Sequence, residues 1–197
     1  MDAELRVPIL SYEQIRKEAN AFLLKYNPGS TVPVPIEEIV EFSLKMSIVP
    51  VPGLQRTLEV DGFISSDLRS ITVDQFVMEE RESRYQFTLA HEVGHAWLHK
   101  AVFGRFNFKT IEDWKNFQMG LTEEAYGWLE FQAYSFAGLV LVPKEQLIHR
   151  WEAHENRIKA AKLNPNTDAA KLIVARSLAA DFKVSPSVIE KRLLKDR

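Results

Sequence analysis

FTLAHEVGHAW, residues 87–97, is the stretch of sequence on which the fold of this chain depends. It places His91 and His95 four positions apart, and a helix brings such positions one turn above each other on the same face. The residues on either side of the motif include no proline or glycine that would interrupt a helix. We therefore expect both imidazoles to project from one helix toward a common point.

The spacing of His91 and His95 is that of two metal ligands. Two neutral imidazoles can share one divalent ion, and zinc accepts histidine nitrogen at about 2.0–2.1 Å. Glu92 points in an adjacent direction, and this HExxH arrangement is typical of metalloproteases in which the glutamate is the general base. The alternative is a helix with two ordinary histidines and a surface glutamate. Three of the five histidines fall between positions 91 and 99. An unpaired imidazole is costly to bury in such an apolar segment, which favours the metal site.

A catalytic zinc site usually needs a third protein ligand. The continuous pattern HExxHxxGxxH is absent, because Leu98 stands at its glycine position and Ala101 at its third histidine. On an uninterrupted helix His99 lies a turn beyond the ion. We expect His99 to support the ligands from behind or to cap the helix, with direct ligation the less favoured alternative.

The segment 123–137 has helical composition and offers two candidate carboxylates. Glu130 shares a helical stripe with Gly127, Ala133, Tyr134 and Ala137, most of them small residues that would let this helix approach the motif helix closely. Glu123 lies two turns earlier on nearly the same stripe and is the competing candidate. In the alternative interpretation both glutamates are simply solvated, as helix carboxylates usually are. The stripe favours Glu130.

Two blocks resemble the ImmA/IrrE group of zinc metallopeptidases. Residues 84–99, RYQFTLAHEVGHAWLH, are similar to the family's arginine followed by FTLAHELGH. Residues 130–143, EFQAYSFAGLVLVP, resemble its E-x-x-A-N-x-F-A-x-x-L-L-M-P. The resemblance implies one Zn²⁺ per chain. It implies His91, His95 and Glu130 as the metal ligands and Glu92 as the catalytic residue.

The second block departs from the family pattern at three positions that touch no proposed ligand. Tyr134 stands where asparagine is usual, and Val140 and Val142 replace leucine and methionine. These departures concern the subfamily and substrate more than the chemistry. The residue that would stabilise the oxyanion is left open among Tyr126, Tyr134, His149 and His154.

The resemblance implies a zinc-dependent endopeptidase that cleaves a separate protein, a helix-turn-helix repressor or antitoxin. One alternative is a zinc-stabilised regulator that binds such a partner without cutting it. Another is DNA binding, because residues 178–193 resemble part of a helix-turn-helix with Lys191 and Arg192 available for phosphates. Residues 144–197 hold 12 Lys or Arg against 7 Asp or Glu, and this small basic excess makes DNA the less favoured partner.

Composition indicates a soluble cytoplasmic protein. The 197 residues, 46% hydrophobic, suffice for one well-buried domain. No run of 18 apolar residues suggests a membrane span, and no signal peptide is visible. Without cysteine there is neither a disulfide nor a thiolate zinc site.

The expected fold is α+β: a zincin-like domain over residues 1–143, with a small twisted sheet beside the motif helix, and a helical tail over 144–197 packed on it. The aromatic segment 100–120 is expected to line the cleft or dock a partner. Strand 69–73 is our candidate edge strand for pairing with a substrate, although an ordinary core strand fits equally well. The expected strands are 47–51, 58–64 and 69–73; the expected helices are 12–26, 35–45, 78–99, 122–141, 144–162, 169–182 and 186–194.

Overall fold

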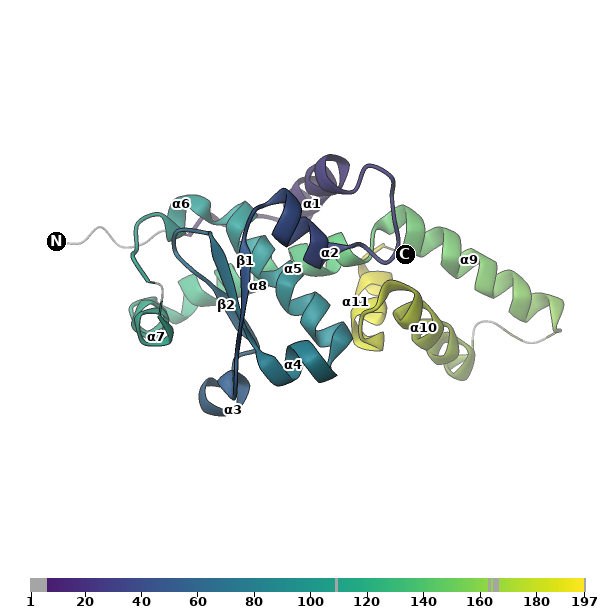
Figure 1. Ribbon diagram of the computed structural model, residues 1–197. Helices are drawn as coiled ribbons and strands as arrows, with labels where there is room; N and C mark the ends of the chain where they lie inside the picture. Colours follow the sequence, from purple (N-terminus) through teal and green to yellow (C-terminus); the bar gives the residue numbers. More distant parts are fainter. Residues whose placement is uncertain (1–6, 109, 163, 165–166, 197) are drawn as a thin grey trace.

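The computed structural model describes residues 7–108, 110–162, 164 and 167–196. It has an α+β fold in which a small sheet lies beside the motif helix and the C-terminal region is helical, which confirms the expected class (Figure 1). The elements are α1 (Tyr12–Tyr26), α2 (Ile36–Glu38), a π-helical turn (Ile39–Ser43), β1 (Ser47–Val51), α3 (Leu54–Leu58), β2 (Gly62–Ile64), β3 (Ser70–Asp74), α4 (Gln75–Glu80), α5 (Glu82–Leu98), α6 (Lys100–Phe103), α7 (Ile111–Met119), α8 (Glu123–Leu141), α9 (Lys144–Ala160), α10 (Asp168–Phe182) and α11 (Pro186–Asp196).

The sheet has the strand order β1-β3-β2. β1 runs parallel to β3, with Ser47 opposite Ser70, and β2 runs antiparallel to it, with Ile64 opposite Ile71. The prediction that strand 69–73 is an edge strand is therefore wrong, because β3 has a partner on each side. The edge strand on the motif-helix side is β2.

The expected strand 58–64 is shorter than predicted. Residues up to Leu58 form helix α3, in which the Thr57 hydroxyl donates to the carbonyl of Gly53. Glu59 then takes a positive φ of 59°, which ends the helix, and β2 begins at Gly62. A Cβ at Gly62 would lie 2.6 Å from the Thr72 carbonyl oxygen and 2.9 Å from Cγ2 of Thr88. Only glycine lets β2 approach α5 this closely.

Two predicted helices are interrupted. The expected helix 78–99 breaks at Arg81, whose φ of −133° separates α4 from α5. No proline or glycine marks this break; it lets α4 pack against the sheet while α5 packs against α8. The expected helix 35–45 widens into the π-helical turn and ends before Lys45, which takes a positive φ of 58°.

Among the described residues, α5 and α8 form the most extensive contact between two helices. A Cβ at Gly94 would lie 3.1 Å from both the Cα and the carbonyl oxygen of Ala133, and 3.3 Å from Phe136. The expected small-residue approach thus occurs at Ala133, whereas Gly127 faces open space with no atom within 4 Å of its ideal Cβ. This crossing brings one turn of α8 over the motif.

The C-terminal helices are anchored to the rest of the chain by Arg192. This buried side chain donates from Nε and Nη2 to the Val142 carbonyl, at 3.2 and 3.0 Å, and from Nη1 to the Tyr12 hydroxyl at 2.8 Å. It also pairs with Asp196, which contacts Arg16 of α1. Figure 1 shows α9 projecting from the body, with α10 returning beside it. Among the described residues, no helix is both long and apolar enough to cross a membrane.

Candidate metal centre

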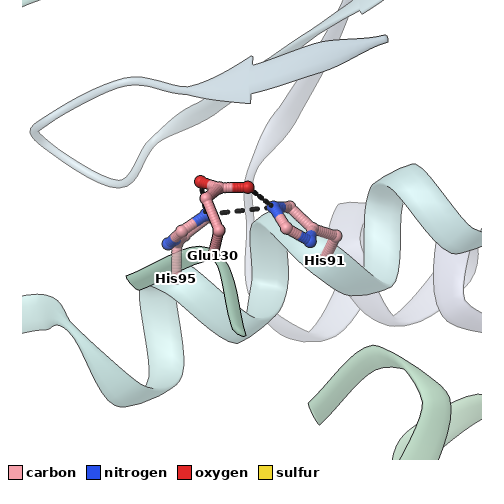
Figure 2. A group of neighbouring side chains, drawn as sticks. All are labelled: His91, His95 and Glu130. Atoms are coloured by element: carbon pink, nitrogen blue, oxygen red, sulfur yellow. Dashed lines mark hydrogen bonds and ion pairs between the residues drawn. The ribbon is translucent and has the colours of Figure 1, made fainter. Parts of the chain in front are cut away.

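Three side chains from two helices converge on one point. His91 and His95 project from α5, and the Glu130 carboxylate reaches over from α8 and spans both imidazoles (Figure 2). The two Nε2 atoms lie 3.1 Å apart; Glu130 Oε2 is 3.2 Å from His91 Nε2, and Oε1 is 3.3 Å from His95 Nε2. Within the described part of the chain this cluster is a group that could hold a metal ion.

The donor set fits zinc in both spacing and charge. Two nitrogens bound to one tetrahedral zinc would lie roughly 3.3 Å apart, close to the separations seen here. Burial would lower the pKa of His91, but its hydrogen bond to Glu130 and the nearby carboxylates outweigh burial and raise that pKa. The site therefore favours a positive charge, which a divalent cation would supply.

The two carboxylates next to the imidazoles have pKa values that are shifted in opposite directions. Burial raises the pKa of Glu92, against the charges of His91 and His95 and a hydrogen bond from the backbone of Ile64. Burial also opposes ionisation of Glu130, yet hydrogen bonds from both imidazoles hold its pKa well below the usual range. An ionised Glu130 suits a ligand, and a Glu92 with a raised pKa suits proton transfer near neutral pH.

His99 lies behind His95 and away from the convergence point. Its Nδ1 is 3.1 Å from His95 Nδ1, and its Nε2 is 3.4 Å from Oε1 of Gln132 on α8. Burial lowers the pKa of His99 to about 3, so this imidazole is neutral. The sequence left support of the ligands and capping of the helix open for His99; the residue lies behind His95 and is also the C-cap residue of α5. The sequence did not point to Gln132.

The cluster opens onto a cleft of about 310 Å³. One wall is β2, so an edge strand does border the site, although not the one predicted. The aromatic segment 100–120 adds to this lining: Trp114 stacks on Phe63 of β2 with ring centroids 5.5 Å apart, and Phe117 packs near Phe103. The expectation that this segment lines the cleft is confirmed. The cleft wall is defined here as Gly62, Phe63, Ile64, Trp114, Phe117 and Gln118.

Of the four candidates for oxyanion stabilisation, the structure retains two. Tyr126 and Tyr134 line the cleft. Burial raises the pKa of Tyr126 to about 12, helped by the charge of Glu130, so its hydroxyl keeps its proton and can donate. His149 and His154 lie on α9 and do not line the cleft, which removes both from that role.

The structure also locates three other side chains that the sequence analysis considered. Glu123 is exposed at the start of α8 and is not part of the cluster. Arg192, expected to be available for phosphates, is 3% exposed and bound inside the protein, so that prediction is wrong. Arg84, the arginine of the first motif block, pairs with Asp61 at 2.5 Å and so ties α5 to the residue preceding β2.

Comparison with known proteins agrees with the geometry. The structure is similar to that of a Mycobacterium tuberculosis transcriptional regulator, with a TM-score of 0.55 and 16% identity over 91% of this chain and 55% of that one. The chain thus spans about half the length of that protein, and the likeness concerns the fold alone. No curated protein matches significantly. The family model described as Peptidase_M78, IrrE N-terminal-like domain, matches residues 78–194. This match contains the whole cluster and more than half of the chain, which therefore belongs to the IrrE N-terminal-like family.

Proposed function

We propose that this protein is a zinc-dependent endopeptidase, with His91, His95 and Glu130 as the metal ligands. The observation that carries the proposal is the convergence of three side chains, whose facing nitrogen and oxygen atoms lie 3.1–3.3 Å apart, in an open cleft with the buried carboxylate of Glu92 beside them. A structural zinc site is usually closed by four protein ligands, whereas a catalytic site has three and an open position.

When bound, zinc would supply Lewis-acid activation of a water molecule and of the scissile carbonyl. Glu92 is the base in this proposal: its carboxylate takes a proton from the attacking water and returns it to the leaving amine. The Ile64 N–H holds this carboxylate in place from β2. Tyr126 and Tyr134 are the hydroxyl donors available to the oxyanion.

The cleft suits an extended peptide. An edge strand can pair with a substrate main chain to main chain, and β2 lies along the cleft beside α5. Trp114, stacked on Phe63 of this strand, and Phe117 also line the cleft and would contact substrate side chains. We propose a helix-turn-helix repressor or antitoxin in the cytoplasm as the substrate, on the basis of the family resemblance. The division at residue 143 into a catalytic domain and a helical tail stays a prediction.

A single substitution separates peptidase activity from binding. Glu92→Gln keeps the size of the side chain but cannot accept the water proton at neutral pH. We expect this variant to fold, hold zinc and bind its partner, yet to produce no fragments in an intact-mass assay in which the wild type cuts the partner in two.

The regulator alternative makes the opposite prediction. If the zinc-loaded wild type binds a helix-turn-helix partner tightly but leaves it intact, the protein acts by binding alone and the peptidase proposal is wrong. Equal cleavage by the wild type and Glu92→Gln would instead remove Glu92 from the mechanism.

A further inference from the structure

Behind the proposed zinc ligand His95, a row of buried polar groups runs from the convergence point to the start of the chain. His95, His99 and Gln132 are 5%, 1% and 0% exposed. Gln132 Nε2 lies 2.8 Å from the carbonyl oxygen of Pro8, in the segment that precedes α1. The row therefore links α5, α8 and the N-terminal segment in one line of hydrogen bonds.

The Pro8 carbonyl at one end of the row determines which group donates and which accepts in each hydrogen bond. A carbonyl oxygen only accepts hydrogen bonds, so Gln132 must turn its NH₂ group toward Pro8. Its Oε1 then faces His99 and can only accept, which requires the hydrogen of His99 to sit on Nε2. In a neutral imidazole the other nitrogen, Nδ1, then carries a lone pair and accepts from His95.

The same reasoning applies to His95 at the proposed metal centre. Because His95 Nδ1 must donate to His99, the neutral His95 ring has its lone pair on Nε2. That is the atom 3.1 Å from His91 Nε2 and 3.3 Å from Glu130. The reverse tautomer would let His95 Nε2 donate to Glu130 while no ion is bound, but it would place a hydrogen on the atom that must bind the ion and set two lone pairs against each other at His99.

We propose that Gln132 and His99 are positioning residues that use the Pro8 carbonyl to fix the tautomer of His95, so that its Nε2 is ready to bind zinc. The inference rests on the proposed function only in taking zinc as the ion. Groups that hold the far nitrogen of a metal-binding histidine commonly change metal affinity 10- to 100-fold.

The first test uses the zinc-loaded wild-type protein and needs no substrate, because in the metal-free protein His95 Nε2 can instead donate to the Glu130 carboxylate. Long-range ¹H–¹⁵N correlation spectra distinguish a protonated from an unprotonated imidazole nitrogen. We expect His95 to be protonated at Nδ1, and His99 to be protonated at Nε2 and unprotonated at Nδ1. Protonation of His99 at Nδ1 would overturn the proposal even if the protein proves to be a peptidase.

The second test compares two buried carboxamides. Gln132→Met removes both hydrogen bonds of Gln132 and keeps its length. The control is Asn27→Leu: Asn27 is 7% exposed, donates to the Thr31 carbonyl and accepts from the Thr31 N–H, but lies outside the row. Both variants should lower the melting temperature of the metal-free protein.

Only Gln132→Met should weaken zinc binding, by roughly 10- to 100-fold in competition with a chelator, and only it should mix the two tautomers of His99 in the zinc-loaded protein. If the two variants lose zinc affinity equally, or if neither does, Gln132 is a structural residue and the proposal is wrong. Failure of Gln132→Met to fold would leave the wild-type spectra to decide.

Discussion

The α5–α8 crossing and the cleft wall hold the same site from two sides, and they are built differently. At the crossing the two backbones are in close contact, because a Cβ at Gly94 would lie only 3.1 Å from the Cα and the carbonyl oxygen of Ala133. In the wall, α7 has no fully buried residue and β2 is only three residues long. The difference indicates that the proposed metal chemistry depends on the crossing and substrate choice on the wall, so that mutations should affect the two separately.

The largest expected effect is the loss of zinc from the crossing. Glu130→Gln keeps the size of the side chain but loses its charge, so zinc affinity should fall by more than the roughly 10- to 100-fold typical of a group behind a ligand. His91→Ala and His95→Ala should each lose most of the metal by elemental analysis. Glu123→Gln, on the same helix, should leave zinc nearly intact; the reverse pattern would move the third ligand two turns along α8.

A matched pair of glycine substitutions tests how tight the crossing is. Gly94→Ala forces a Cβ against the Ala133 backbone and should reduce the free energy of unfolding by about 1–3 kcal/mol. Gly127→Ala lies in the same helix pair but meets open space, and should stabilise the protein by roughly 0.5–1 kcal/mol. Urea unfolding measures both, and equal effects would show that the crossing is not close-packed.

Trp114→Ala tests the wall. Removing its stacking on Phe63 should lower kcat/KM for the protein substrate by about tenfold, from a ring contact of roughly 1 kcal/mol and lost apolar contact. Zinc content should not change. Trp128→Ala is the control, because Trp128 contacts Phe131 on α8 and does not line the cleft. Loss of zinc in Trp114→Ala would contradict the separation of wall from crossing.

The smallest expected effect is a dependence of stability on pH that arises at the crossing. Burial lowers the pKa of His99 to about 3, whereas an unfolded histidine titrates near 6.5. Between these values the unfolded chain binds the extra proton, so the metal-free protein should lose stability as the pH falls from about 6.5 toward 3. His99→Gln should flatten this profile in urea unfolding; an unchanged profile would mean that His99 does not contribute.

Local periodicity was sufficient to predict much of the proposed site. Two features of single helices can be read from the sequence without knowledge of the tertiary structure. They are the four-residue spacing of His91 and His95 and the small residues near Glu130. Helix α1 and strand β1 have the predicted bounds, and local features set those bounds: Asn27 follows α1, Pro52 follows β1, and the structure adds a Ser11 side chain that caps the start of α1.

Features that depend on distant residues were not predictable. Strand order is decided by pairing across the sheet, so no local pattern showed that β3 is central and β2 is the edge. The break at Arg81 follows from packing on both sides of it. Gln132 looked like an ordinary helix residue because one of its partners, Pro8, lies 124 positions away in the sequence.

Arg192 has a consequence for the order in which the molecule folds. Its hydrogen bond to Tyr12 joins residues 180 positions apart, and a contact of such sequence separation closes a very long loop. Earlier contacts, among them the pairing of α5 with α8, must offset that loss of chain entropy before this bond can form. Interactions made after the transition state slow unfolding rather than speed folding. We therefore expect the Arg192 anchor to lengthen the lifetime of the folded protein more than it speeds folding.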